Sequence, residues 1–90
     1  MSSNFLPFEH IVATQLDDGE GVLVDLNTRQ YYQLNETAML IWRGLESGHA
    51  FDQIVADIVA AYAVDNERAV ASAERLLAKL QEQKLVRPAR

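Results

Sequence analysis

The sequence predicts a single α+β domain in which a three-stranded antiparallel sheet is followed by three helices. The chain has 90 residues, which is enough for one hydrophobic core and too few for two. Apolar and β-branched residues dominate short segments in its first third, whereas apolar residues recur at helical spacing in the rest. Three short strands cannot bury their apolar face alone, and three helices laid on one face would cover it.

We expect the strands at residues 10–16, 22–26 and 30–34. An Asp-Asp-Gly-Glu-Gly turn separates the first two strands, and Asn-Thr-Arg, a connection of hairpin length, separates the last two. This arrangement leaves one face of the sheet and at least one strand edge open. An open edge exposes unpaired main-chain groups unless another segment covers it.

We expect the helices at residues 36–47, 51–62 and 66–83, each with one apolar stripe at helical spacing. Asn35 and Asp65 precede the first and third helices, where a side-chain oxygen can accept a hydrogen bond from a free N–H group. The sequence therefore predicts the element order βββααα.

The domain is expected to span residues 9–86, with the apolar pair at 85–86 closing the core. Residues 1–8 are expected to form a flexible arm, because Pro7 cannot donate a main-chain hydrogen bond to a neighbouring strand. Residues 87–90 are expected to form a tail.

Composition argues against several classes of function. The chain has no cysteine, which excludes disulfides, thiolate nucleophiles and cysteine-ligated metals, and its net charge of −5 disfavours nucleic-acid binding. His10 and His49 are isolated, and neither lies in a metal-binding or catalytic motif. There is no apolar run long enough to span a membrane and no signal peptide. We therefore expect a non-catalytic cytoplasmic protein without metal or cofactor.

Two adjacent tyrosines lie in the third predicted strand. Adjacent strand residues point to opposite faces, so Tyr32 shares the core face with Leu34, and Tyr31 is expected on the surface. An exposed ring there either shields the sheet or forms part of a ligand-binding surface.

The third predicted helix sorts its charges. Arg68, Ser72, Arg75 and Lys79 lie along one flank of the apolar stripe, whereas Glu67 and Glu74 lie on the other. This pattern fits either a solvated helix face or a basic wall suited to an acidic or carbonyl-rich peptide.

Together, the open strand and the basic helix predict a groove for an extended peptide, which would join the sheet edge through main-chain hydrogen bonds. The predicted site residues are Gln30, Tyr31, Tyr32, Gln33, Leu34, Arg68, Ser72, Arg75, Leu76 and Lys79.

The order and spacing of several segments resemble the PqqD-like family, also called RiPP recognition elements. The segments are VLVDLNTRQYYQLNETAMLIWRGLESG and FDQIVADIVAAYAVDNERAVASAERLLAKLQEQKLV, and the resemblance covers about residues 9–86. It implies a winged-helix-like fold and binding of the leader segment of a ribosomally made precursor peptide by the third strand and third helix. It also implies a partner enzyme, such as a radical-SAM maturase or a leader peptidase. The stretch DLNTRQYYQLNETAMLIW looks more like the discrete proteins of lasso-peptide clusters than those of pyrroloquinoline quinone synthesis.

This chain departs from the family pattern at two helix ends. Ala50, a weak cap, stands where many members have Ser or Thr, and Lys84 stands where many have Gly. Two other functions stay open: a winged-helix DNA-binding regulator, and a small dimerisation module whose open edge pairs with its own copy. The protein is accordingly expected as a monomer or weak homodimer.

Overall fold

The computed structural model describes residues 5–88. Its main sheet contains β2 (Ile11–Gln15), β3 (Gly21–Asp25) and β4 (Tyr31–Leu34), all antiparallel and in the order β2-β3-β4. Three helices follow: α1 (Glu36–Glu46), α2 (Phe51–Tyr62) and α3 (Asn66–Glu82). The α+β fold with a three-stranded antiparallel sheet followed by three helices is therefore confirmed, and the ends of these six elements differ from the predicted ones by about one residue.

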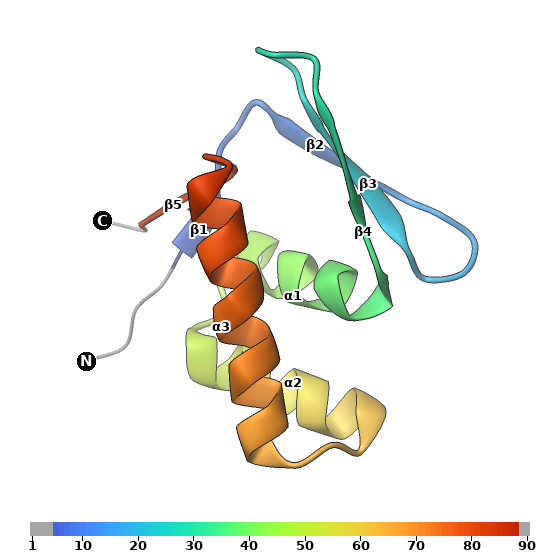
Figure 1. The fold of residues 1–90 in the computed structure, drawn as a ribbon, viewed down its shortest axis with the longest axis vertical. Helices are drawn as coiled ribbons and strands as arrows, with labels where there is room; N and C mark the ends of the chain where they lie inside the picture. Colours follow the sequence, from blue (N-terminus) through green and yellow to red (C-terminus); the bar gives the residue numbers. More distant parts are fainter. Residues whose placement is uncertain (1–4, 89–90) are drawn as a thin grey trace.

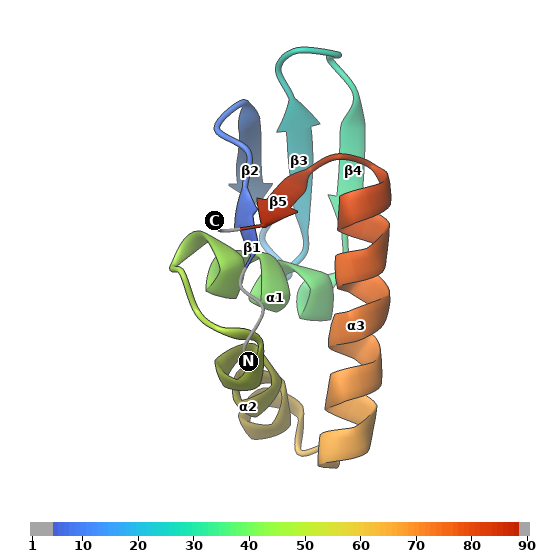
Figure 2. The same ribbon diagram turned by 90° about the vertical axis from the view of Figure 1, so that its left-hand side faces the viewer.

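Figures 1 and 2 show the helices on one side of the three-stranded sheet, with α3 running alongside β4. The core lies between the sheet and the helices. Its largest fully buried side chains are Trp42, Leu23, Ile41, Leu45, Ile54, Leu80 and Leu85. Gly21 lets α1 approach the sheet closely, because a Cβ at this position would collide with the side chain of Met39.

The N-terminal segment corrects the prediction of a flexible arm over residues 1–8. Residues 1–4 and 89–90 lie outside the described residues. Within residues 5–88, β1 (Phe5–Pro7) pairs antiparallel with β5 (Val86–Pro88), so residues 5–7 and 87–88 form strands and not an arm and a tail. Pro7 is tolerated because the next residue, Phe8, donates its N–H to the carbonyl of Leu85 at 3.1 Å. Hydrogen-bonded pairs alternate along an antiparallel ladder, so the main-chain nitrogen of Pro7, one residue before Phe8, points away from β5. The N–H that proline lacks is therefore not needed for pairing.

The predicted helix caps are confirmed. Oδ1 of Asn35 accepts from the N–H of Ala38, and Oδ1 of Asp65 accepts from the N–H of Arg68, both at 2.8 Å. These caps fix where α1 leaves β4 and where α3 begins its run back towards the sheet.

The two departures from the family pattern also have the expected local effect. Ala50 makes no side-chain cap at α2. Lys84 adopts a positive φ of 61°, a conformation that glycine adopts more easily. This turn directs Leu85 and Val86 into the core.

Candidate functional site

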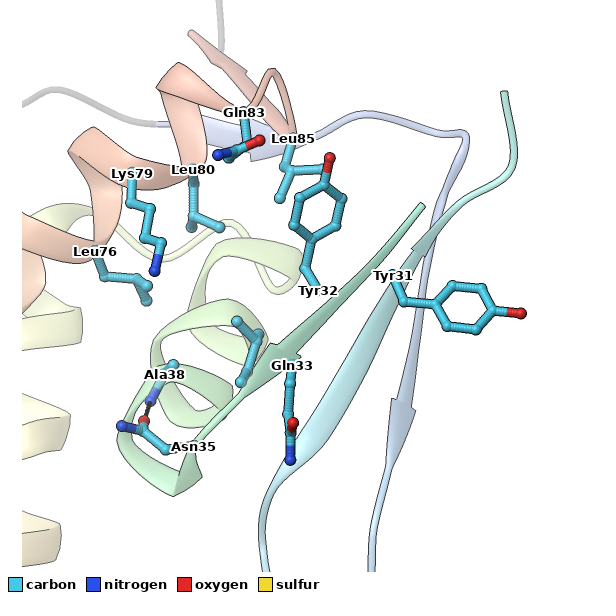
Figure 3. A pocket seen from close by; sticks show the side chains of 11 residues that line it. Tyr31, Tyr32, Gln33, Asn35, Ala38, Leu76, Lys79, Leu80, Gln83 and Leu85 are labelled. Carbon is cyan, nitrogen blue, oxygen red and sulfur yellow. Dashed lines mark hydrogen bonds between the residues drawn. The ribbon is translucent and has the colours of Figure 1, made fainter. Parts of the chain in front are cut away.

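A pocket of about 360 Å³ lies between β4 and the last turns of α3. It is lined by residues of β4 and α3, together with Ala38 of α1 and Leu85. Figure 3 shows Leu76, Lys79 and Leu80 reaching from α3 towards β4. The pocket therefore lies beside the edge strand β4, and its lining combines apolar and polar side chains.

A second pocket of about 310 Å³ adjoins the first, between the start of α1 and the middle of α3. Asn35, Ala38, Leu76 and Lys79 line both pockets. The two form one continuous depression, which we call the groove. It runs from β4 past the N-terminus of α1 to Ser72 and Arg75.

The main chain of β4 has one edge paired with β3. The N–H of Asp25 donates to the carbonyl of Gln30 at 2.9 Å, so the ladder between β3 and β4 begins with this pair. Hydrogen-bonded pairs alternate along an antiparallel ladder. With Leu23 opposite Tyr32 and Gly21 opposite Leu34, those two residues of β4 are also directed at β3.

The alternation leaves the N–H and C=O groups of Tyr31 and Gln33 directed away from β3. The ladder between β2 and β3 agrees with this register. The N–H of Leu26 donates to the carbonyl of His10 at 2.9 Å, so the main-chain groups of Leu26 are directed at the β2 side and not at β4. Among the described residues β4 pairs only with β3. Four main-chain groups of β4 are therefore free to bind an added strand along the mouth of the groove.

The two tyrosines of β4 occupy opposite faces, as predicted. Tyr32 packs against the core, and its hydroxyl donates to Oε1 of Gln30 at 2.8 Å. Tyr31 is 74% exposed, and Figure 3 shows its ring pointing away from the pocket. Tyr31 thus lines the pocket with its main chain, and its ring belongs to the opposite face of the sheet.

The structure brings eight of the ten predicted site residues to the groove. They are Tyr31, Tyr32, Gln33, Leu34, Ser72, Arg75, Leu76 and Lys79. Gln30 precedes β4 and lines a third pocket of about 410 Å³ beside the β3–β4 turn. Arg68 is exposed in the first turn of α3 and lines none of these three pockets.

Sequence reasoning missed the contributions of α1 and of the end of α3. Asn35, Thr37 and Ala38 line the groove from α1, and Leu80 and Gln83 line it from α3. The Asn35 cap indicated where α1 begins, but nothing in the sequence indicated that this end would face α3.

The groove carries positive charge in an acidic chain. Arg75 and Lys79 are the charged residues lining its two pockets, and no carboxylate lines either one in the part of the chain that the structure describes. Within residues 5–88, neither cation forms a salt bridge. Both are therefore available to pair with an acidic ligand.

The β3–β4 turn is organised by the buried carboxylate of Asp25. Its Oδ1 accepts from the N–H groups of Asn27 at 2.9 Å and Thr28 at 3.1 Å, and His10 lies 3.8 Å away. Burial opposes ionisation of Asp25, but the hydrogen bonds from Thr28 and Asn27, with the nearby imidazole, hold its pKa below the ordinary value. The carboxylate thereby fixes the turn that delivers β4 to the groove.

Two other kinds of site are not found within residues 5–88. No group of three or more histidine, aspartate or glutamate side chains is placed to hold a metal ion. None of the helices there is long and apolar enough to cross a membrane.

Comparison with known proteins places this chain in a family. The model of the family described as coenzyme PQQ synthesis protein D (PqqD) matches residues 20–86. A structure of TbiB1 in complex with the TbiA(beta) leader peptide is similar, with 30% identity, a TM-score of 0.83 and coverage of 90% of this chain and 93% of that chain. Lasso peptide synthetase B1 complexed with the leader peptide has the same identity and TM-score, and coverage of 94% and 99%. A comparison with curated proteins found no similar sequence. The chain belongs to the PqqD family.

Proposed function

We propose that this protein binds the leader segment of a ribosomally synthesised precursor peptide in the groove and delivers it to a modifying enzyme or leader peptidase. The bound segment adds a strand to the free edge of β4. Two similar proteins were solved with leader peptides, and one of them is a lasso peptide synthetase B1. The precursor of a lasso-type cluster is therefore the substrate class that we favour.

The observation that carries this proposal is the free edge of β4 beside a pocket lined by both apolar and polar residues. The N–H and C=O groups of Tyr31 and Gln33 point towards the position of an added strand. A peptide paired there would turn alternate side chains towards Leu76 and Leu80 of α3. Main-chain pairing supplies affinity, and the pocket selects the side chains.

The energetics agree with a reversible complex. Four hydrogen bonds at a net value of about 0.5–1.5 kcal/mol each contribute about 2–6 kcal/mol. One or two apolar anchors add about 1.5–3 kcal/mol each. Association and ordering of a flexible peptide cost several kcal/mol in return. The expected dissociation constant lies between micromolar and high nanomolar, which corresponds to a binding free energy of about −8 to −10 kcal/mol.

The charges of the groove favour an acidic peptide. Arg75 and Lys79 line the groove from α3, and no carboxylate of residues 5–88 lines it. An acidic side chain of the peptide that faces α3 would meet one of these cations, which adds specificity and speeds association.

The protein acts without chemistry of its own in this proposal. Holding the leader raises the effective concentration of the attached core peptide at the partner enzyme. Neither His10 nor His49 lines the groove. A DNA-binding role is disfavoured, because α2 contains Asp52 and Asp57 and no lysine or arginine.

A binding titration tests this function. A fluorescein-labelled N-terminal segment of a candidate precursor peptide would be titrated with the protein, and fluorescence anisotropy would report binding at physiological salt. We expect saturable binding of the N-terminal segment and none of the C-terminal core segment. Absence of binding, or equal binding of both segments, would refute the proposal. A labelled DNA duplex in the same assay tests the regulator alternative.

A further inference from the structure

The face of the three-stranded sheet opposite the helices has an unusual composition. Antiparallel sheets with one wet face normally alternate apolar and polar residues. On β3, Leu23 is fully buried on the helix side, while Val22 and Val24 point to the other side, and Leu26 continues their alternation. An apolar outer row on this central strand is typical of a sheet face that another element covers.

Strand register gathers these side chains into a patch. Val12 lies opposite Val24, and Val24 lies opposite Tyr31, so the three form one row across the sheet. We define the outer patch as Val12, Val22, Val24, Leu26 and Tyr31. No lysine or arginine lies within it.

The outer patch is also where exposed apolar surface concentrates. Within residues 5–88, the large hydrophobic side chains that are exposed are Val12, Leu16, Leu26 and Tyr31, at 44%, 40%, 57% and 74%. All four belong to the sheet or its connections, and none to a helix. Contiguous apolar patches on the surface of soluble proteins are typical of interaction sites.

We propose that the outer patch docks the enzyme that processes the bound peptide. This inference rests on the proposed function, which makes such an enzyme the natural partner. The patch is continuous with the peptide edge, because Tyr31 supplies main-chain groups to that edge and its ring to the patch. A peptide strand on β4 would extend the outer face and place its own alternate side chains beside Tyr31. The enzyme would then contact the protein and the peptide on one surface.

The charges around the patch favour a partner with basic residues over a second copy of this chain. Asp17, Asp18 and Glu20 form the β2–β3 turn at one end of the patch, and Arg29 lies at the other end. The chain carries a net charge of −5, so two copies repel each other. The partner surface is therefore expected to be apolar, with lysine or arginine at the margin that meets the acidic turn.

A double variant outside the groove provides the test. Val12→Thr with Leu26→Gln removes apolar surface from two exposed positions and keeps a β-branched residue in β2. The matched control is Ala60→Gln, which changes an exposed position on α2. Biolayer interferometry would measure binding of each protein to a candidate leader peptidase or radical-SAM maturase, with and without the leader segment. Anisotropy would measure leader binding separately.

We expect the double variant to bind the leader within about twofold of the wild type and the enzyme at least about tenfold more weakly, in the range of lost interface anchors. The leader should strengthen enzyme binding by the wild type. The single variant Asp17→Lys should also weaken enzyme binding, and its effect should shrink as salt is raised.

Several results would overturn the inference. Enzyme binding by the double variant equal to that of the Ala60→Gln control would remove the patch from the interface. No enzyme binding by the wild type in either condition would reject docking while leaving leader binding intact. Sedimentation showing a wild-type dimer that the double variant loses would assign the patch to a second copy. Failure of leader binding alone would count against the proposed function and not against the patch. The enzyme titration without leader tests the patch separately.

Discussion

Replacing Gln33 with proline removes one main-chain donor from the free edge of β4 and little else. The N–H of Gln33 is directed away from β3, so its loss breaks no hydrogen bond of the sheet. Proline is tolerated on edge strands when its nitrogen faces outward. The substitution therefore isolates a hydrogen bond that exists only in the complex with a peptide.

The expected magnitude follows from the group that loses its partner. A carbonyl of the bound peptide would be left without the N–H of Gln33, which costs about 1–3 kcal/mol. A central value of about 1.5 kcal/mol corresponds to roughly a tenfold rise in the dissociation constant. Anisotropy titration with the labelled leader segment measures this change, and circular dichroism with thermal melting checks the fold.

Two control variants sharpen the result. Gln33→Thr changes the side chain but keeps the N–H, so it should bind the leader within about twofold of the wild type, as for surface substitutions without partners. Tyr32→Pro removes a donor directed at β3 and should destabilise the sheet itself. A folded Gln33→Pro variant with unchanged affinity would refute pairing of the peptide with this edge.

Three further predictions concern charge, a helix end and acid stability. Arg75→Glu should weaken leader binding by about tenfold or more, because it replaces attraction with repulsion at the groove. The control Arg87→Glu, in β5 outside the groove, should leave leader binding unchanged. Equal effects of the two variants in anisotropy titrations would remove Arg75 from the site. Lys84→Gly should raise stability by about 1 kcal/mol, because its φ of 61° suits glycine, and a lower thermal midpoint would contradict this. The lowered pKa of Asp25 contributes stability that is present above its ordinary value of 3.8 and is lost as the pH falls through the folded-state pKa. Asp25→Asn should therefore flatten the loss of stability below about pH 4 in chemical denaturation, and an unchanged pH profile would contradict the role of this carboxylate.

Most of the fold could be predicted from local patterns. Alternation of apolar residues located the strands, and the Asn35 and Asp65 caps located the helix starts. The pairing of β1 with β5 escaped prediction because it joins the two ends of the chain. Pro7 argued against a strand on local grounds, and only the register of the pair shows that its missing N–H is not needed.

The groove was predictable in outline and not in detail. The open edge of β4 and the basic flank of α3 follow from sequence periodicity, and they form two of its walls. The contribution of Ala38 and the outward direction of the Tyr31 ring depend on how α1 and the sheet are oriented in space. Arg68 shares a flank of α3 with Arg75 but lies about two helical turns before it, beyond the end of the groove.

Amide hydrogen exchange at β4 tests the central claim most directly. Without peptide, the N–H groups of Tyr32 and Leu34 should already be protected by β3, whereas those of Tyr31 and Gln33 should exchange rapidly. Addition of the leader segment should slow exchange at Tyr31 and Gln33. Rapid exchange at both amides in a saturated complex would contradict binding of the leader as an added strand.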